Sequence, residues 1–243
     1  MCLIALAYQV HPHFPLIVLA NRDEFLERPA RPAHFWQDKP GILAGRDERA
    51  GGTWLGLTTN GRFAALTNHR DLRQPAVQGP SRGQLVVHAL EGELQPTDER
   101  PMDGYNLIHG PIAALKYRTN ILGKEELLPP GIHGLSNALL NTPWPKVERL
   151  KHAFSGLVRS PDPQPERLFD LLLDRSFAPV DRLPDTGLDV TRERELSPAF
   201  IAMPGYGTRC STLVMVDKDG GTLFEERTYQ PPGIVAERLN LPR

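Results

Sequence analysis

The first twenty residues of this chain contain two apolar runs separated by a short turn. Cys2 to Val10 is rich in strand-forming residues, and Leu16 to Ala20 resumes the apolar pattern after a proline-containing turn at His11 to Pro15. Short runs that are apolar on both faces are typical of strands buried inside a protein. We therefore expect a buried β-hairpin that begins at the N-terminus, with residue 2 at the start of its first strand.

The remaining elements follow the order strands, helices, strands. Strands are expected at 41–46, 53–58, 63–67, 105–110, 113–118, 211–217 and 222–229, helices after Ser81 and at 145–154 and 166–173, and an irregular stretch at 179–204. This order predicts an α+β fold in which helices cover antiparallel strands. A doubly wound parallel fold would alternate strands and helices from the start, and the chain has no GxGxxG or GxxxxGK[ST] phosphate loop. We expect one domain that spans residues 1–243.

Charge and composition exclude several classes of function. The 243 residues include 28 Lys and Arg and 29 Asp and Glu, so no basic excess is present to bind nucleic acid or an anionic membrane. The apolar runs are far shorter than the roughly 20 residues that cross a bilayer. Two cysteines cannot form a disulfide framework, which is typical of a reducing compartment. We expect a cytoplasmic protein with no nucleic-acid partner and no integral membrane segment.

The histidines and the loops give no sign of a cofactor. The chain has eight histidines, but they form neither an HExxH motif nor a Cys/His set at ligand spacing. We therefore expect no metal site and no cofactor.

Cys2 is the residue whose side-chain chemistry is most informative. After removal of Met1, its thiol would stand beside the α-amine of the same residue. The reference pKa values are about 8.5 for the thiol and about 7.7–8.0 for the amine. The amine can then accept the proton of the thiol near neutral pH, as in N-terminal threonine nucleophiles. The alternative is that Cys2 only begins a buried strand.

Three polar segments are candidates to join Cys2 in a site. Asn21 to Glu24 (NRDE) ends the second strand, so the hairpin brings it back beside Cys2. Gly134 to Asn137 places an asparagine after a glycine, and Gly205 to Ser211 places Arg209 where a loop enters a strand. An asparagine amide can stabilise an oxyanion, and an arginine can hold a carboxylate. Taken alone, each segment is typical of a turn or of surface charges.

Nine short motifs in this order resemble the NRDE-motif family, which is the family of transport and Golgi organisation protein 2. The motifs are Met1-Cys2, Asn21 to Glu24, Gly51 to Gly56, Leu66 to Asn68, Ser81 to Gly83, Tyr105 to Leu107, Gly134 to Asn137, Thr142 to Lys146 and Tyr206 to Arg209. The resemblance implies an N-terminal nucleophile hydrolase-like fold, a four-layer αββα sandwich of antiparallel sheets between helices. For the eukaryotic member it also implies an association with haem or lipid handling.

Within that fold, the functional pattern resembles that of the choloylglycine and penicillin V acylases, which hydrolyse amides from an N-terminal cysteine. The resemblance implies that Cys2 is the nucleophile. It implies that Asn68 and Asn137 are the asparagines of the oxyanion hole and the site loop. Arg209 resembles the site arginine of those acylases.

The NRDE segment departs from the acylase pattern, which has Arg-Asn-x-Asp. Only one of Arg22 and Asp23 can match, because alternation along a strand sends Arg22 to the face opposite Asn21 and Asp23. We place Asp23 near the thiol and keep Arg22 as the alternative.

The leading prediction is a cysteine amidohydrolase that cleaves carbon–nitrogen bonds of linear amides after removal of Met1. The predicted catalytic residues are Cys2, Asp23, Asn68, Asn137 and Arg209, and the predicted substrate-binding residues are Asn21, Arg22, Trp54, Ser136 and Thr208. The partner would be a small-molecule amide. The alternative is a non-catalytic protein that binds and carries haem, a lipid or another hydrophobic metabolite on the same fold.

Overall fold

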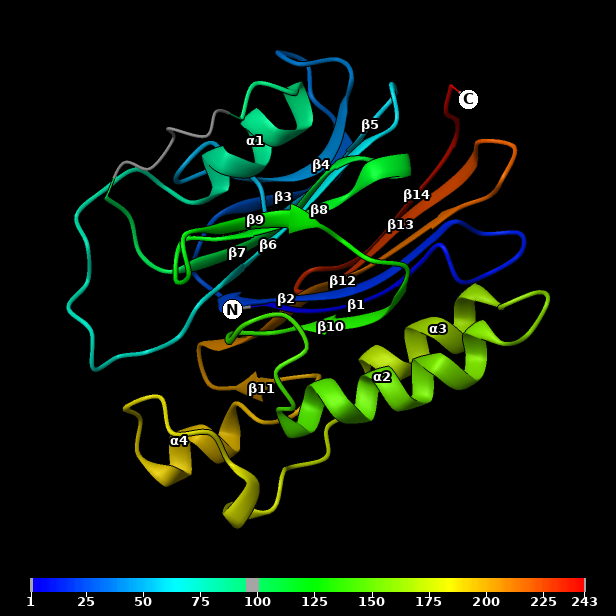
Figure 1. Cartoon of the computed structure of the whole chain (residues 1–243). Coiled ribbons are helices and arrows are strands. Elements are labelled where there is room, and N and C mark those ends of the chain that lie inside the picture. The colour runs from blue at the N-terminus through cyan, green and yellow to red at the C-terminus, as the bar shows by residue number, and fades with distance from the viewer. Residues whose placement is uncertain (1, 95–100, 243) are drawn as a thin grey trace.

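The computed structural model describes residues 2–94 and 101–242, and its strands form two antiparallel sheets that pack face to face (Figure 1). The strands are β1 (Cys2–Tyr8), β2 (Leu16–Phe25), β3 (Ala30–Phe35), β4 (Ile42–Asp47), β5 (Leu55–Thr58), β6 (Arg62–Asn68), β7 (Tyr105–Pro111), β8 (Lys116–Thr119), β9 (Lys124–Leu127), β10 (Gly131–Leu135), β11 (Ala202–Met203), β12 (Tyr206–Val216), β13 (Gly221–Tyr229) and β14 (Pro232–Asn240). The helices are α1 (Gly83–Glu91), α2 (Pro145–Val158), α3 (Pro165–Leu172) and α4 (Val190–Glu195), with short 3₁₀ turns at Ile112–Ala114 and Val180–Arg182.

The predicted N-terminal hairpin is present and lies inside the first sheet. This sheet, called sheet A, has the order β10-β1-β2-β12-β13-β14, with β11 paired to β12. Sheet B has the order β3-β4-β5-β6-β7-β8-β9. β1 and β2 lie inside sheet A, with sheet B over one face and helices over the other, which explains the continuous apolar runs in the sequence.

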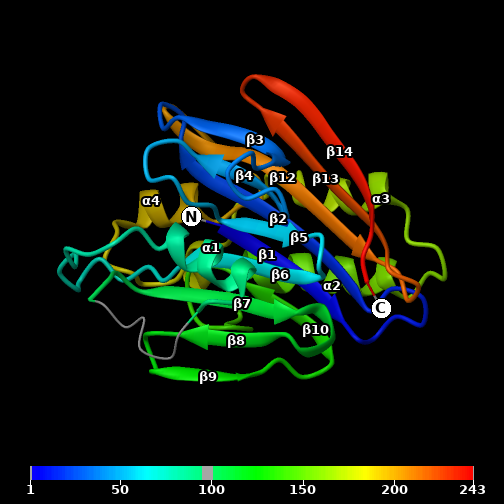
Figure 2. The same cartoon turned by 90° about the horizontal axis from the view of Figure 1, so that it is seen from above.

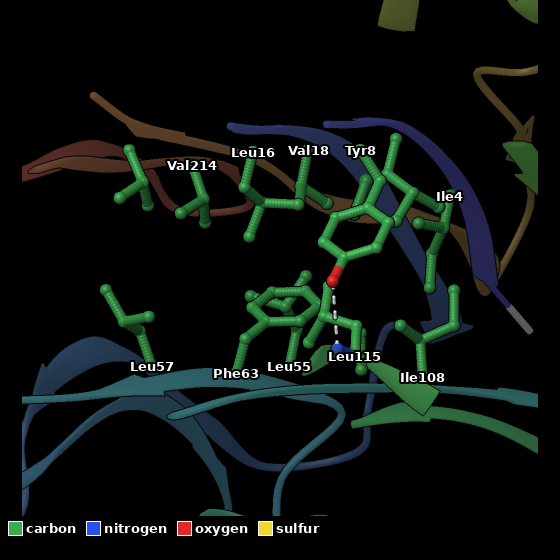
Figure 3. Close-up of a cluster of buried hydrophobic side chains, with 14 of the residues drawn as sticks. Ile4, Tyr8, Leu16, Val18, Leu55, Leu57, Phe63, Ile108, Leu115 and Val214 are labelled. Carbon is green, nitrogen blue, oxygen red and sulfur yellow. Dashed lines mark hydrogen bonds between the residues drawn. The ribbon is translucent and has the colours of Figure 1, made fainter. Parts of the chain in front are cut away.

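Alternate residues of the hairpin serve two different cores. Ile4, Tyr8 and Val18 point between the sheets and meet Phe63 and Leu115 of the sheet B side (Figure 3). The backbone N–H of Leu115 donates a hydrogen bond of 3.1 Å to the Tyr8 hydroxyl, which links the two sheets inside this core. The intervening residues of the hairpin face the helices instead.

Helices cover the outer faces of both sheets. α2 and α3 pack on sheet A, where Leu3 and Leu19 meet Phe154 and Phe169. α1 packs on the outer face of sheet B, with Val86 and neighbouring residues against β5, β6 and β7. Figure 2 shows α1 on the near side of the sheets and α2 and α3 on the far side. The result is the four-layer αββα sandwich of an α+β protein, as predicted.

Several elements were not predicted, and most of them are polar. β9 is exposed along its whole length at the edge of sheet B. α4 lies in the stretch 179–204 that was predicted to be irregular, and it is held by its buried Glu193 rather than by an apolar face. β2 continues to Phe25, five residues beyond the predicted end at Ala20, since its polar part is paired with β12.

Candidate functional site

Cys2 lies at the end of a row of side chains that crosses sheet A. It pairs with Arg22 of β2, Arg22 pairs with Cys210 of β12, and Cys210 pairs with Thr228 of β13. Directly opposed residues of antiparallel strands point to the same face. This face is the one toward sheet B, since Ile4, two residues after Cys2, belongs to the core between the sheets. The ladder therefore puts Arg22, rather than Asp23, on the face of Cys2.

Arg22 is buried against an aromatic ring from sheet B. Its guanidinium carbon lies 4.0 Å from the centroid of the Trp54 ring, and its Nη2 lies 3.9 Å from Oδ2 of Asp47. Asp47 has a closer partner in Arg28, at 2.8 Å. The ring of Trp54 approaches β4 closely because residue 45 is glycine, and a Cβ there would overlap the ring. Arg22 and Trp54 thus form a cation–π pair between the two sheets.

A small polar cavity of about 120 Å³ opens beside the Cys2 thiol. Its walls include Cys2, Arg22, Asp23, Trp54, Asn68 and Arg82. The loop before Trp54 and the start of α1 meet closely beside it, because a Cβ on Gly52 would lie 2.5 Å from the carbonyl carbon of Gly83. The glycines of two sequence motifs, Gly51 to Gly56 and Ser81 to Gly83, therefore close one side of this cavity.

The surroundings of the Cys2 thiol favour its protonated form. The side chain is half-buried, and burial raises the pKa of the thiol above its usual value. The negative charges of Asp23 and Glu24 raise this pKa further, and the positive charge of Arg22 opposes them. A reaction at Cys2 consequently needs a base to remove the proton.

Asn68 presents an amide to this cavity, and Asn137 lies behind it. Nδ2 of Asn137 donates a 2.8 Å hydrogen bond to the backbone carbonyl of Asn68. Within residues 2–94 and 101–242, the Asn68 side chain makes no hydrogen bond of its own. The Ser136 hydroxyl is within 3.3 Å of both the Cys2 carbonyl and Oδ1 of Asn137. Asn137 and Ser136 therefore tie β6 and the loop after β10 to the first residue of β1.

Asp23 lies on the opposite face of β2, toward α2, although it also borders the cavity. Its Oδ1 accepts a 2.7 Å hydrogen bond from the Thr208 hydroxyl. Lys146, in the first turn of α2, is buried nearby and donates a 3.0 Å hydrogen bond to the Leu196 carbonyl. Burial lowers the pKa of Lys146 to about 8, and the charge of Asp23 opposes this shift. Sequence reasoning missed Lys146, although it ends the Thr142 to Lys146 motif.

Asn21 has a bonding pattern that joins elements of the fold. Its Nδ2 donates hydrogen bonds of 2.8 Å to the carbonyls of Leu172 and Ala199, and its Oδ1 accepts one of 2.5 Å from the Ser211 hydroxyl. These bonds hold the end of α3 and the 199 segment against β2. The side chain faces away from the cavity of Cys2.

Arg209 lies in a second cavity, next to that of Cys2. β12 has a bulge between Thr208 and Cys210, and Arg209 is the residue that the bulge displaces. Its Nη1 donates to three backbone carbonyls, including that of Arg28 at 2.7 Å. The second cavity has a volume of about 200 Å³ and is lined by Arg209, Arg22 and Trp54 among others. The structure thus brings Cys2, Arg22, Asp23, Trp54 and Asn68 to one cavity and Arg209 to its neighbour.

One known protein family matches most of this chain. The model of the Transport and Golgi organisation 2 family matches residues 1–231. This chain belongs to that family. It is 35% identical over 259 residues to the Transport and Golgi organization 2 homolog of Mus musculus, covering 94% of this chain and 93% of the relative. Identity to Transport and Golgi organization protein 2 of Drosophila melanogaster is 26% over 261 residues, covering 94% and 92%.

A solved structure shares the fold of this Transport and Golgi organisation 2 family member. It is the mutant C2A conjugated bile acid hydrolase from Clostridium perfringens, with a TM-score of 0.52, 9% identity, and coverage of 99% of this chain and 93% of that one. The likeness supports the N-terminal nucleophile hydrolase-like fold. In the part of the chain that the structure describes, no group of three or more His, Cys, Asp and Glu could hold a metal ion. No helix among these residues is long and apolar enough to cross a membrane.

Proposed function

We propose that this protein is a cysteine amidohydrolase that uses Cys2, after removal of Met1, to cleave a linear amide. The observation that carries the proposal is the position of Cys2, whose half-buried side chain borders a polar cavity together with the side chain of Asn68. A cysteine that only began a buried strand would not need a polar cavity and an asparagine side chain beside it. The conjugated bile acid hydrolase from Clostridium perfringens, which has the same fold, supports the reaction class.

The reaction begins with the proton of the thiol. Because the pKa of the thiol is raised, the α-amine freed by removal of Met1 acts as the base, and the sulfur attacks the amide carbon. Nδ2 of Asn68 donates to the oxyanion, and Asn137 holds Asn68 in place. The amine leaves with a proton from the α-ammonium, which leaves a thioester on Cys2. Water then hydrolyses the thioester and restores the thiol.

Asp23 and Thr208 position the amine in this proposal. Asp23 lies beside the start of β1 on the side away from the thiol, and Thr208 fixes its carboxylate by the 2.7 Å hydrogen bond. A carboxylate there stabilises the ammonium that forms when the sulfur attacks. Arg22 stabilises the thiolate from the other side, because it faces Cys2 across the ladder.

The proposal is tested with a chain that carries a removable extension before Cys2. The extension converts the α-amine to an amide, which is no base near neutral pH, and specific proteolysis restores Cys2 as the first residue. The same protein is assayed before and after cleavage on a panel of acyl 4-nitroanilides, with intact mass to verify each form. We expect the rate to rise about 10²- to 10⁴-fold on cleavage, the usual contribution of a general base.

Cys2→Ser is the companion variant, since it keeps the amine and removes the better nucleophile. We expect it to lose most of the activity of the cleaved protein. Turnover that survives both the extension and Cys2→Ser would show that Cys2 is not the nucleophile. If no amide is hydrolysed and haem binds saturably to all forms alike, the protein is a carrier instead.

A further inference from the structure

The second cavity adjoins the proposed active site through two shared side chains. Arg22 and Trp54 line both the cavity of Cys2 and the cavity of Arg209. Neither cavity, at about 120 and 200 Å³, reaches the roughly 300 Å³ at which ligand pockets begin. A ligand that occupies both would pass the Arg22–Trp54 pair.

Three arginines line the second cavity: Arg22, Arg31 and Arg209. Arg31 pairs with Glu48 at 2.6 Å. Among the described residues, no carboxylate oxygen lies within 4.0 Å of Arg209, and the one near Arg22 is Asp47 at 3.9 Å. Nη1 of Arg209 is used by backbone carbonyls, so Nη2 and Nε remain for a ligand. Burial lowers the pKa of Arg209, and the like charge of Arg22 lowers it further. An anion between the two would relieve this repulsion.

The cavity also contains one acid, Glu226, which already has its own partner. Oε1 of Glu226 accepts a 2.7 Å hydrogen bond from the backbone N–H of Ala33. Burial raises the pKa of this carboxyl, which favours its neutral form. The lining of the cavity thus has three arginines against this single carboxyl group.

Part of the wall of the second cavity is apolar. Ala30, Pro32, Trp54 and Pro231 line it, beside the polar side chains of Thr228 and Gln230. A hydrocarbon chain can lie against these rings, while a charged end group reaches Arg209. A ligand made only of charged groups would leave the apolar walls without contacts.

The strand ladder gives the distance between the two cavities. Cys2 lies on β1 and Cys210, next to Arg209, lies on β12, with β2 between them. Neighbouring strands are about 4.8 Å apart, so the separation is about 10 Å. This is close to the extended length of a medium-chain dicarboxylic acid.

We propose that the substrate is a monoamide of a medium-chain dicarboxylic acid, with its amide at Cys2 and its free carboxylate held by Arg209, on the far side of the Arg22–Trp54 pair. This inference rests on the proposed amidohydrolase function. It assigns Arg209 to substrate recognition at the far end of the acyl chain, and it assigns Trp54 to the contact with the middle of that chain.

Binding to the Cys2→Ala variant tests this subsite without requiring turnover. The probes are the mono-anilide of suberic acid, which ends in a carboxylate, and the same compound with a terminal carboxamide. We expect the carboxylate to bind roughly tenfold or more tightly than the carboxamide in calorimetry, as a charge-assisted hydrogen bond predicts. The mono-anilide of succinic acid is too short to reach both ends and should bind more weakly than the suberic compound.

Arg209→Gln in the Cys2→Ala background should abolish the preference for the carboxylate, and Arg209→Lys should keep part of it. Arg192→Met, an exposed arginine of α4 that pairs with Glu195, is the matched control and should leave the preference unchanged. Equal binding of carboxylate and carboxamide to Cys2→Ala overturns the subsite. If the preference is present but the cleaved protein hydrolyses no amide, the subsite stands and the amidohydrolase function fails.

Discussion

Arg22 and Asp23 are adjacent in the chain but act on opposite faces of one strand. Arg22 points between the sheets, beside Cys2 and Trp54, while Asp23 points toward α2 and meets Thr208. Lys146 supplies a buried positive charge on the side of Asp23. The start of β1 therefore lies beside two charged environments, with Arg22 on the face of the Cys2 thiol and Asp23 and Lys146 on the opposite face of β2.

The buried Lys146 gives a testable dependence of stability on pH. The pKa of Lys146 is about 8 in the folded chain, whereas its ordinary value is 10.5. At a pH between these two values, the unfolded chain therefore binds more protons than the folded chain. The contribution of Lys146 to the free energy of unfolding should then rise with pH across this window, by about 2 to 3 kcal/mol. Below pH 8 both states are protonated, and the cost of burying the charge is fully present.

Urea unfolding of the natural protein and of Lys146→Met measures this effect. The difference in unfolding free energy between the two should change in favour of the natural protein from pH 8 to 10.5. Lys218→Met replaces an exposed lysine and should give a difference that does not vary with pH. A constant difference for Lys146→Met as well would contradict the buried-lysine interpretation.

At the scale of elements, the approach of α2 to β10 controls where Lys146 lies. A Cβ on Gly134 of β10 would lie 2.6 Å from Cγ1 of Val147 and 2.7 Å from Cδ of Lys151, both on α2. The strand and helix are thus in direct contact, and only glycine fits at this point. Asn141, after β10, accepts a 2.8 Å hydrogen bond from Lys151 and closes the same junction.

Two glycine substitutions around this junction should have opposite effects. Gly134→Ala forces α2 away from the sheet and should lower the free energy of unfolding by about 1 to 3 kcal/mol, the usual cost of overpacking. Gly156→Ala, in an exposed position of α2 with no atom near its Cβ, should raise it by about 0.5 to 1 kcal/mol. Chemical denaturation of both variants provides the measurement. A stabilising Gly134→Ala would show that the helix can move without cost.

At the scale of the whole molecule, the two sheets are joined by an apolar core with a polar contact inside it. The Tyr8 hydroxyl accepts a hydrogen bond from the N–H of Leu115 (Figure 3). It also accepts one of 2.9 Å from Nε2 of the exposed Gln9. The core holds the two sheets in one relative position. The cavities of Cys2 and Arg209 lie at one end of the same interface.

Tyr8→Phe tests this contact between the sheets. It leaves the buried N–H of Leu115 without the hydroxyl and should lower the free energy of unfolding by about 1 to 3 kcal/mol. Gln9→Met removes the exposed donor to the same hydroxyl and should change stability by less than about 0.5 kcal/mol. Thermal and urea unfolding would measure both variants. A loss of stability in Tyr8→Phe as small as that expected for Gln9→Met would mean that the buried hydrogen bond contributes nothing.

The sequence predicted the parts of the fold that bury apolar residues periodically. The hairpin of β1 and β2 and the helices α2 and α3 follow from their apolar patterns, and the hairpin places the NRDE segment beside Cys2. β9 has no buried residue to reveal it, and the pairing of β2 with β12 joins distant parts of the chain. Arg209 lies in its own cavity because of a bulge that no local pattern encodes. Lys146 was missed because lysines are rarely buried.

The two-sided pairing of β2 has a consequence for how this chain can vary in evolution. A single inserted codon between Ala20 and Arg22 would exchange the faces of every residue that follows in the strand, so that the aspartate would meet Trp54 and the arginine would meet α2. Two inserted codons would restore the faces, but they would shift the NRDE segment by two positions relative to Cys2. Parity therefore excludes single insertions inside this strand, and the shift relative to Cys2 opposes double ones, whatever the reaction that the site performs.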